Sequence, residues 1–583
     1  MKLFLTILLH LTILHSPDAQ IILRIVHQPE KEIDGKIDSV YLNGSDYKSF
    51  NDSIDIEIYL QNLISELHSA AYLAASIDSL NYTDSLAFAY LYTGRQYRRV
   101  NVSVDNIDSE TLRNLNIRTR RFEKPVSFED FRRLQDRILS HFENTGYPFV
   151  KVFLSEPLVD GDMISGLLII DKNNRFNIDN IHILGDLPVD VKHLYRHIGI
   201  SVGDPYSEKK FTNAGVLLRE TAFLTEVRAP EMEFMRNTAD MYLYVGRRQA
   251  SQFSGILGIL PGGPDRSFKI AGELNLSLLN VLGKMENIEL QWQNPGNNVQ
   301  QLDVGAGQPY LFGRSFGVDL QLHMHRQDST YMKIEAEAGI PFTLQDRGIL
   351  RAWLRTTGST LIAGGGYVAG LTVPAAEIRG QSAGLSWRRH KIDNRINPYR
   401  GWLVHGSAGA GNKSITLPAD QTSPGKVSKG RFGEGSVRLE WFIPVTGSTT
   451  LMFANLSAIK MNFGTQDEDN FFFANEMYLL GGIHSIRGFD ERSIAASAYS
   501  IQRIEYRYLF EESSNIFLFF DGMVYKQRLP GPDISDTPYG FGGGFTFNTR
   551  AGQFAISYAL GSQMGNPLSF RSGKVHMGIV NRF

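Results

Sequence analysis

Residues 318–325, Val-Asp-Leu-Gln-Leu-His-Met-His, alternate between apolar and polar side chains. Successive side chains of a β-strand point to opposite faces, so this stretch predicts a strand with one apolar and one polar face. The same period recurs at 286–293, 436–443 and 554–561. A single such strand fits a soluble β-sandwich as well as a barrel. The repetition over roughly 340 residues, against the roughly 100 of a sandwich domain, favours a barrel.

Composition supports a β-rich membrane protein and excludes several other classes. The 583 residues include 55 glycines, 36 phenylalanines and 24 tyrosines, which suit many strands, tight turns and aromatic girdles. The net charge of −2 gives no reason to expect nucleic acid as a partner. The absence of cysteine excludes disulfides, thiolate metal sites, thiol catalysis and a lipid anchor on cysteine.

Residues 1–19 read as a secretory signal peptide. Lys2 precedes an apolar run from Leu3 to Leu14, and a small residue, Ala19, marks the cleavage region before Gln20. A buried N-terminal helix is the less favoured alternative. Beyond the signal, no stretch approaches the roughly 18 consecutive apolar residues that indicate a spanning helix. A location within a membrane therefore requires a barrel, whose closed ladders satisfy the backbone inside lipid.

The chain changes character near Gly246. Before it, a pattern of strand, helices and two strands recurs about every 75 residues, which predicts α+β domains at 20–94, 95–175 and 176–246. After it, residues 247–583 form the barrel, where about 20 residues per strand and connection predict sixteen antiparallel strands. Two domains plus a divergent cap remain an alternative, because the first copy is the weakest.

The individual copies rest on helix signals. In the first, a helix around 60–67 precedes strand candidates at 71–80 and 85–92. In the second, Ser127 and Asp130 are placed like a capping box that opens a helix ended by Gly146. In the third, Val191, Leu194 and Ile198 share one face of a short helix, and Gly199 follows it.

Residues 480–489, Leu-Gly-Gly-Ile-His-Ser-Ile-Arg-Gly-Phe, resemble the hallmark loop motif of the BamA/TamA superfamily, whose members combine POTRA domains with a barrel. Residues 393–401, Asp-Asn-Arg-Ile-Asn-Pro-Tyr-Arg-Gly, resemble the opening of a mid-barrel strand in that superfamily. Residues 519–522, Phe-Phe-Asp-Gly, resemble its strand that carries an acidic partner for the loop arginine. The resemblance covers the whole chain in architecture, with specific motifs only from Asp393 onward.

The resemblance implies that the loop tip folds back inside the barrel; the tip is Ile486, Arg487, Gly488 and Phe489. It also implies a C-terminal β-signal for insertion, carried by Met577, Ile579 and Phe583. Val575 is in step with these residues.

The residues themselves support an ion pair at the loop tip. Residues 502–510 alternate so that an apolar face leaves Arg503, Glu505 and Arg507 pointing into the lumen. A guanidinium inside a narrow lumen requires carboxylate partners, so we expect Arg487 to pair with Asp521 and, less firmly, with Glu505. The alternatives are a solvated Arg487 at a loop tip and an Asp521 that only lines a pore.

Other motifs give weaker signals. Residues 540–544, Gly-Phe-Gly-Gly-Gly, lack the strand–turn–helix context of a phosphate loop, so close backbone approach is the better interpretation. His323 and His325 share a face without a third ligand at suitable spacing, so we expect lumen polarity rather than a metal site. No nucleophile elbow or paired catalytic carboxylates occur, which predicts a non-enzyme without cofactor.

The resemblance implies a factor that assembles or inserts outer-membrane proteins. Expected partners are the outer-membrane bilayer, nascent outer-membrane or secreted polypeptides, and periplasmic or lipoprotein subunits, with the N-terminal domains in the periplasm. One alternative is a two-partner-secretion pore that exports a passenger through the lumen, since such pores share the loop motif. A second is an adaptor whose barrel is only an anchor.

Overall fold

A computed structural model describes most of the chain. The described residues are 21–27, 47–83, 86–104, 107–118, 122–260, 269–294, 299–327, 330–344, 348–362, 375–394, 397–416, 427–463, 471–511, 514–528, 533–549 and 552–579. The chain divides into two compact units; the second contains residues 180–202, 210–233 and 240–583. No helix among the described residues has both the length and the apolar character needed to cross a bilayer.

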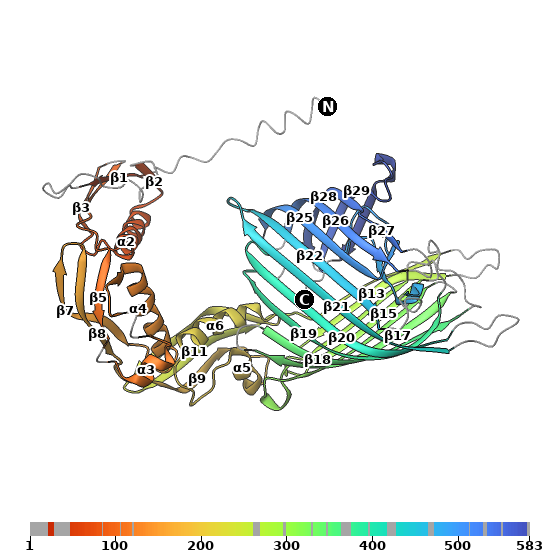
Figure 1. The fold of residues 1–583 in the computed structure, drawn as a ribbon, viewed down its shortest axis with the longest axis horizontal. Helices are drawn as coiled ribbons and strands as arrows, with labels where there is room; N and C mark the ends of the chain where they lie inside the picture. Colours follow the sequence, from red (N-terminus) through yellow and green to blue (C-terminus); the bar gives the residue numbers. More distant parts are fainter. Residues whose placement is uncertain are drawn as a thin grey trace, which may run out of the picture. The chain divides into compact units, whose positions relative to one another are not determined.

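The first small sheet has strand order β2-β1-β4-β3 and carries one helix (Figure 1). Its elements are β1 (Ile21–His27), β2 (Tyr47–Phe50), α2 (Ser53–Ser69), β3 (Ser76–Tyr82) and β4 (Leu86–Tyr92). α2 begins at Asp52, whose carboxylate caps the amide of Asp55. The strand expected from residue 71 begins only at Ser76, because Ala71 adopts a positive φ of 74° in the turn after α2.

The second small sheet has strand order β6-β5-β8-β7. Its elements are β5 (Arg99–Ser103), α3 (Ser109–Asn114), β6 (Val126–Ser127), α4 (Phe128–Glu143), β7 (Lys151–Asp160) and β8 (Met163–Asp171). The Ser127 hydroxyl accepts the amide of Asp130, as the capping pattern predicts. One face of α4 is buried against the sheet because its apolar residues follow the helical period; they are Phe128, Phe131, Leu134, Ile138 and Phe142.

The third small sheet has strand order β10-β11-β9 and two helices. Its elements are β9 (Asn177–Gly185), α5 (Val191–Ile198), α6 (Glu208–Glu220), β10 (Leu224–Met235) and β11 (Thr238–Arg247). Gly199 ends α5 with a positive φ of 72°, the conformation that glycine adopts without strain. Leu194 and Ile198 are buried as expected, but Val191 in the first turn is exposed.

The segment from the end of β9 to α5 contacts the ends of early barrel strands. Asn280, in the turn after β13 (Lys269–Leu279), donates its amide to the carbonyl of Pro188 at 3.0 Å. The Arg196 Nε donates to the carbonyl of Gly313 at 3.0 Å, in the turn after β15 (Gln300–Gln308). These turns are short, so the docking marks the short-turn end of the barrel.

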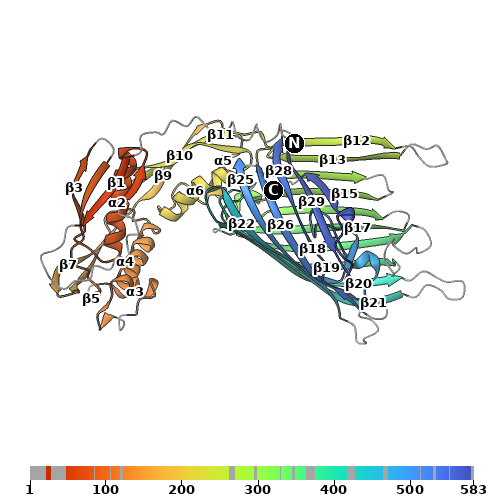
Figure 2. The same ribbon diagram turned by 90° about the horizontal axis from the view of Figure 1, so that it is seen from above.

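In the described part of the chain, the barrel is one large antiparallel sheet of 17 strands. Figure 2 shows these strands side by side. Its strands are β12 (Gln252–Leu260), β13, β14 (Asn287–Asn294), β15, β16 (Val318–Gln327), β17 (Tyr331–Thr343), β18 (Gly348–Leu361), β19 (Glu377–Ile392), β20 (Gly401–Thr416), β21 (Val427–Pro444), β22 (Thr449–Asn462), β25 (Ala498–Glu511), β26 (Ser514–Gln527), β27 (Ile534–Asp536), β28 (Tyr539–Thr549), β29 (Gly552–Ser562) and β30 (Lys574–Ile579). The predicted class, α+β domains followed by an antiparallel barrel, is confirmed. The strand beyond the sixteen predicted is β27, which has three residues.

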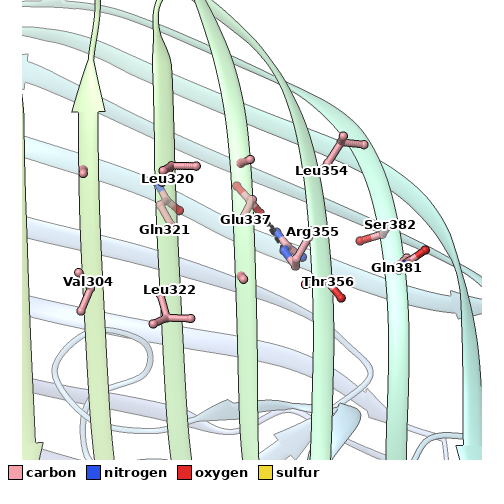
Figure 3. Close-up of a pocket in the computed structure, with 13 residues that line it drawn as sticks. Val304, Leu320, Gln321, Leu322, Glu337, Leu354, Arg355, Thr356, Gln381 and Ser382 are labelled. Carbon is pink, nitrogen blue, oxygen red and sulfur yellow. Dashed lines mark hydrogen bonds and ion pairs between the residues drawn. The ribbon is translucent and has the colours of Figure 1, made fainter.

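The two faces of the sheet differ as the alternation predicts. Large apolar side chains are exposed on the outer face, among them Leu320, Leu354 and Leu518. The inner face carries charge, and on β17 and β18 Glu337 pairs with Arg355 at 2.7 Å (Figure 3). An apolar outer surface with a charged interior is the arrangement of a barrel in lipid.

The ladder between the first and last strands is missing from the described part of the chain. There β12 pairs only with β13, and β30 pairs only with β29. β30 contributes six residues to its ladder, against eleven in β29. We call this junction of β12 and β30 the seam.

The outward orientation of Leu354 can be tested by placing a charge there. Near the bilayer midplane an arginine costs about 2–4 kcal/mol, so we expect Leu354→Arg to lower the free energy of unfolding by about that amount. The measurement is a urea titration of the protein folded in phosphatidylcholine vesicles. Leu354→Ala is the matched control, because it removes apolar area without adding charge. Equal losses for the two variants would contradict a lipid-facing side chain.

Candidate functional site

The connection from β22 to β25 contains a segment that lies against the inner face of the barrel. This segment, residues 471–497, is called the inner loop here; it contains a 3-10 turn (Ala474–Glu476) and the short strands β23 (Tyr478–Leu480) and β24 (Ile494–Ala496), which pair with each other. Ile486 and Phe489 are buried in an apolar cluster with residues of the loop and of β25 and β26. The loop is therefore a packed part of the interior.

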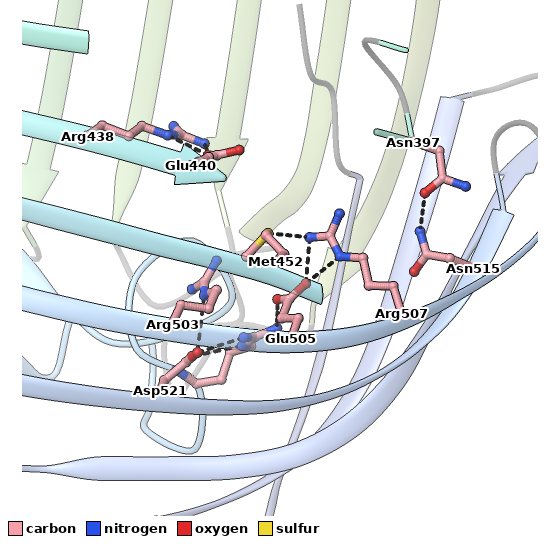
Figure 4. Close-up of polar contacts among 10 residues, drawn as sticks. Asn397, Arg438, Glu440, Met452, Arg503, Glu505, Arg507, Asn515 and Asp521 are labelled. Atoms are coloured by element: carbon pink, nitrogen blue, oxygen red, sulfur yellow. Dashed lines mark hydrogen bonds and ion pairs between the residues drawn. The ribbon is translucent and has the colours of Figure 1, made fainter. Parts of the chain in front are cut away.

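The guanidinium of Arg487 is bound by two carboxylates, Glu505 and Asp521. Figure 4 shows these two carboxylates with Arg503 and Arg507 beside them. Its Nε and Nη2 donate to the two oxygens of Asp521 at 2.8 and 2.7 Å, a bidentate pair. Its Nη1 donates to Glu505 at 2.7 Å, and its backbone amide donates to Asp521 at 3.1 Å. Arg487 is 3% exposed and Asp521 is 0% exposed. The structure thus brings together the arginine and both carboxylates that the sequence pattern singled out.

Two further arginines complete this cluster. Arg503 faces Asp521 across the β25–β26 ladder and donates to it at 3.1 Å. Arg507 donates to Glu505 at 2.7 Å. Three guanidinium groups thus share two carboxylates, which leaves an excess of positive charge. The Phe519 ring lies 3.5 Å from the Arg487 guanidinium and offsets part of it through a cation–π contact.

Glycines make room for the loop tip. Gly488 has a positive φ of 95°, so the chain turns sharply after Arg487. A Cβ on Gly540 of β28 would lie 2.0 Å from the Arg487 carbonyl oxygen, and a Cβ on Gly561 of β29 would lie 2.6 Å from the Gly488 carbonyl oxygen. Close backbone approach is therefore the reason for glycine at both wall positions.

The loop tip also contacts the last strand. The Gly488 amide donates to Nε2 of His576 at 3.0 Å, and Asp490 pairs with Lys574 at 2.7 Å. Both partners are on β30, and His576 is buried. The tip thus touches the strand that borders the seam.

A second contact network lies at the short-turn end of the barrel, where β25 and β26 are joined. Asn397, from the motif at 393–401, donates to the carbonyls of Glu511 and Ser514 at 3.2 and 3.1 Å. It also accepts the side-chain amide of Asn515 at 2.9 Å (Figure 4). Asn397 therefore binds the ends of β25 and β26 on either side of their connecting turn.

Comparison with known proteins identifies the family. The model of the Omp85 superfamily domain matches residues 280–583, more than half of the chain. The chain belongs to the Omp85 superfamily. Members of this superfamily are assembly and transport factors rather than enzymes. The comparison with curated proteins gives no match.

Several solved structures are similar to this Omp85 protein at low sequence identity. CdiB from Escherichia coli is 14% identical, with 90% of this chain and 97% of that chain covered and a TM-score of 0.49. CdiB from Acinetobacter baumannii is 11% identical, with coverages of 82% and 88% and a TM-score of 0.48. BamA from Haemophilus ducreyi lacking POTRA domains 1-3 is 14% identical, with coverages of 82% and 98% and a TM-score of 0.40.

Two of the remaining predicted site residues of this Omp85 protein, Met577 and Ile579, lie on the last strand. Met577 is exposed on the outer face of β30, and Ile579 is its final residue. Phe583 lies outside the described residues, so the β-signal remains a prediction. His323 contacts Asp303 at 2.6 Å, and the described residues contain no group of three potential metal ligands.

Some contacts of the inner loop were missed from the sequence. Arg503 could have been found, because it faces Asp521 once β25 and β26 are paired in register. His576 and Asn397 contact residues about 90 to 120 positions away along the chain, and no local period signals such contacts. Their roles follow only from the folded structure.

Loss of the Arg487 side chain should release the inner loop. Removing one partner of a buried ion pair costs about 3–5 kcal/mol; Arg503 and Arg507 remain on the carboxylates, so we expect the lower value for Arg487→Ala. A cysteine replacing Ala495, which is buried in β24, reports release through maleimide labelling, because the chain has no other cysteine. At about 1.4 kcal/mol per factor of ten, labelling should accelerate about a hundredfold.

The control for this experiment is Arg438→Ala, which removes a half-exposed arginine that pairs with Glu440 on β21. It should leave labelling of the cysteine unchanged. If Arg487→Ala also left labelling unchanged, the ion-pair cluster would not be what holds the loop.

The close backbone approach at Gly540 can be tested separately from the ion pairs of Arg487. Gly540→Ala should displace the loop tip, because the added Cβ meets the Arg487 carbonyl at 2.0 Å. Gly543→Ala on the same strand is the matched control, since its Cβ would meet the flexible end of Leu518 at 3.0 Å instead. Faster labelling at position 495 is expected for Gly540→Ala alone. Similar labelling rates in both variants would contradict a role for the close approach at Gly540.

Proposed function

We propose that this Omp85 protein inserts or assembles polypeptides in the bacterial outer membrane, with its three small domains in the periplasm. Two observations carry the proposal: in the described part of the chain no ladder joins β12 and β30, and the inner loop fills part of the lumen. Unpaired strand edges present free backbone donors and acceptors to another strand. A client strand can pair with such an edge, so the seam offers a template for client barrels.

The three small domains, here called the arm, supply a second place to bind extended polypeptides. β7 is an edge strand of the second small sheet, with Phe153 and Leu158 exposed along it. An added strand gains main-chain hydrogen bonds from an edge and side-chain contacts from alternate residues. We infer that β7 captures unfolded clients, and that periplasmic or lipoprotein subunits bind other faces of the arm. No nucleotide enters this mechanism.

The rival function is a pore that exports one passenger through the lumen. It requires a continuous water-filled path, whereas the inner loop contacts several parts of the wall. Lys413 on β20 pairs with Glu476 of the loop, and Asn475 donates to the Ser359 hydroxyl of β18 at 2.7 Å. These contacts favour passage at the seam over passage through the lumen.

A reconstitution experiment separates the two functions. The protein in phosphatidylcholine vesicles is mixed with a urea-denatured outer-membrane barrel, and the folded client is measured by heat-modifiable migration on gels. We expect faster client folding than in empty vesicles, and little ion conductance in planar bilayers. High conductance without faster client folding would overturn assembly in favour of export.

The same experiment tests the edge of β7. Phe153→Lys combined with Leu158→Lys should slow client folding, because the two charges disfavour pairing of an apolar client strand with β7. Both positions are exposed, so the substitutions should not unfold the domain. Val227→Lys, at a comparably exposed position on β10, is the control. Equal slowing of client folding by the control would contradict the capture of clients at β7.

A further inference from the structure

We propose that residues 488–492 of the inner loop form a strap that joins the last strand to the early wall of the barrel, across the seam and from inside the lumen. The inference rests on the proposed function, because it concerns what limits the width of the seam. The strap is defined by contacts at its two ends, one on β30 and one on β15 and β16. Release at either end would let the seam widen.

The β30 end of the strap has two contacts of different kinds. The Gly488 amide donates to Nε2 of His576, which must therefore be unprotonated at this nitrogen. Asp490 forms an ion pair with Lys574, two residues earlier on the same face of β30. Because β30 pairs on one side only among the described residues, these contacts are its support from the lumen.

The other end of the strap is Arg492. Its Nη2 donates to the side-chain oxygen of Gln301 on β15 at 2.6 Å, and its Nη1 donates to Nδ1 of His325 on β16 at 2.8 Å. The second contact leaves Nε2 of His325 to donate to Gln327 at 3.2 Å. Arg492 has a φ of 59°, a conformation that residues other than glycine rarely adopt.

The acceptors on the early wall are themselves held in position. Gln301 donates its side-chain amide to Asp303 at 2.6 Å, which turns its oxygen toward Arg492. Asp303 also binds His323 on the neighbouring strand at 2.6 Å. The receiving site for Arg492 is thus a connected polar network that spans two strands.

The length of the strap suits a bridge over the seam. Paired strands lie about 4.8 Å apart, so in a closed wall the four spacings from β30 through β12, β13 and β14 to β15 would measure about 19 Å. Four residue steps from Gly488 to Arg492 reach at most about 14 Å. The arginine side chain supplies further reach, and a chord inside a curved wall is shorter than the arc.

The base of the strap is anchored independently. Arg487 immediately precedes it and is held on β25 and β26 by Glu505 and Asp521. Loss of Arg492 therefore leaves the arginine–carboxylate cluster in place. This separation allows the strap to be tested without undocking the whole inner loop.

The test measures the width of the seam by electron paramagnetic resonance. Spin labels are attached to cysteines that replace Phe253 on β12 and Met577 on β30, both exposed positions, in a chain with no other cysteine. The protein is studied in phosphatidylcholine vesicles without client. We expect Arg492→Ala, and separately Lys574→Ala with His576→Ala, to lengthen the main distance by about one strand spacing, about 5 Å.

Gln301→Ala removes an acceptor of Arg492 and gives a further route to the same result if a first variant does not fold, as judged by heat-modifiable migration. Arg438→Ala is the control, because it removes a charged side chain on β21 outside the strap. Unchanged distances in all folded strap variants would overturn the proposal, as would equal lengthening in the control.

The outcome is independent of the client assay. If strap variants widen the seam but the protein does not accelerate client folding over empty vesicles, the strap stands and the assembly function is overturned. If the protein folds clients and the seam does not respond, the strap alone is wrong.

Discussion

The buried charge of Arg487 is the interaction on which the interior of the barrel depends. A guanidinium with almost no exposure to water persists only where carboxylates and further hydrogen-bond acceptors meet it. Asp521 and Glu505 satisfy that requirement from two neighbouring strands, and Arg487 reaches them because its loop folds back into the lumen. The ion pairs therefore determine where the loop lies, and the loop in turn determines which parts of the wall are linked.

The hairpin of β25 and β26 is the point where these links converge. The inner loop binds its inner face through Arg487, while Asn397 caps its turn from the short-turn end. A hairpin that is bound both at its inner face and at its turn is rigid, because a shift of either strand would break charged or buried hydrogen bonds. The motifs at 393–401, 480–489 and 519–522 meet there, although they are far apart along the chain.

The sequence predicted the parts of this structure that follow from local periods. Alternation assigned the faces of the strands, and the capping pattern at Ser127 placed the start of α4. The pairing of Arg487 with Asp521 came from a motif joined to a charge argument. The contacts of His576, Arg492 and Asn397 could not be predicted, because they depend on how distant strands are arranged around the lumen. The start of β3 was misplaced, since the turn at Ala71 leaves no signal in composition.

The contacts of the barrel restrict which strands can move if the seam opens. Pro188 and Arg196, which lie between β9 and α6, contact the short-turn ends near β13 and β15, and Arg492 contacts β15 and β16 from the lumen. The early strands are thus held by two sets of contacts. Among the described residues, β30 has one short ladder and its contacts with residues 488 and 490. A displacement of β30 therefore breaks fewer of these contacts than a displacement of the early strands does.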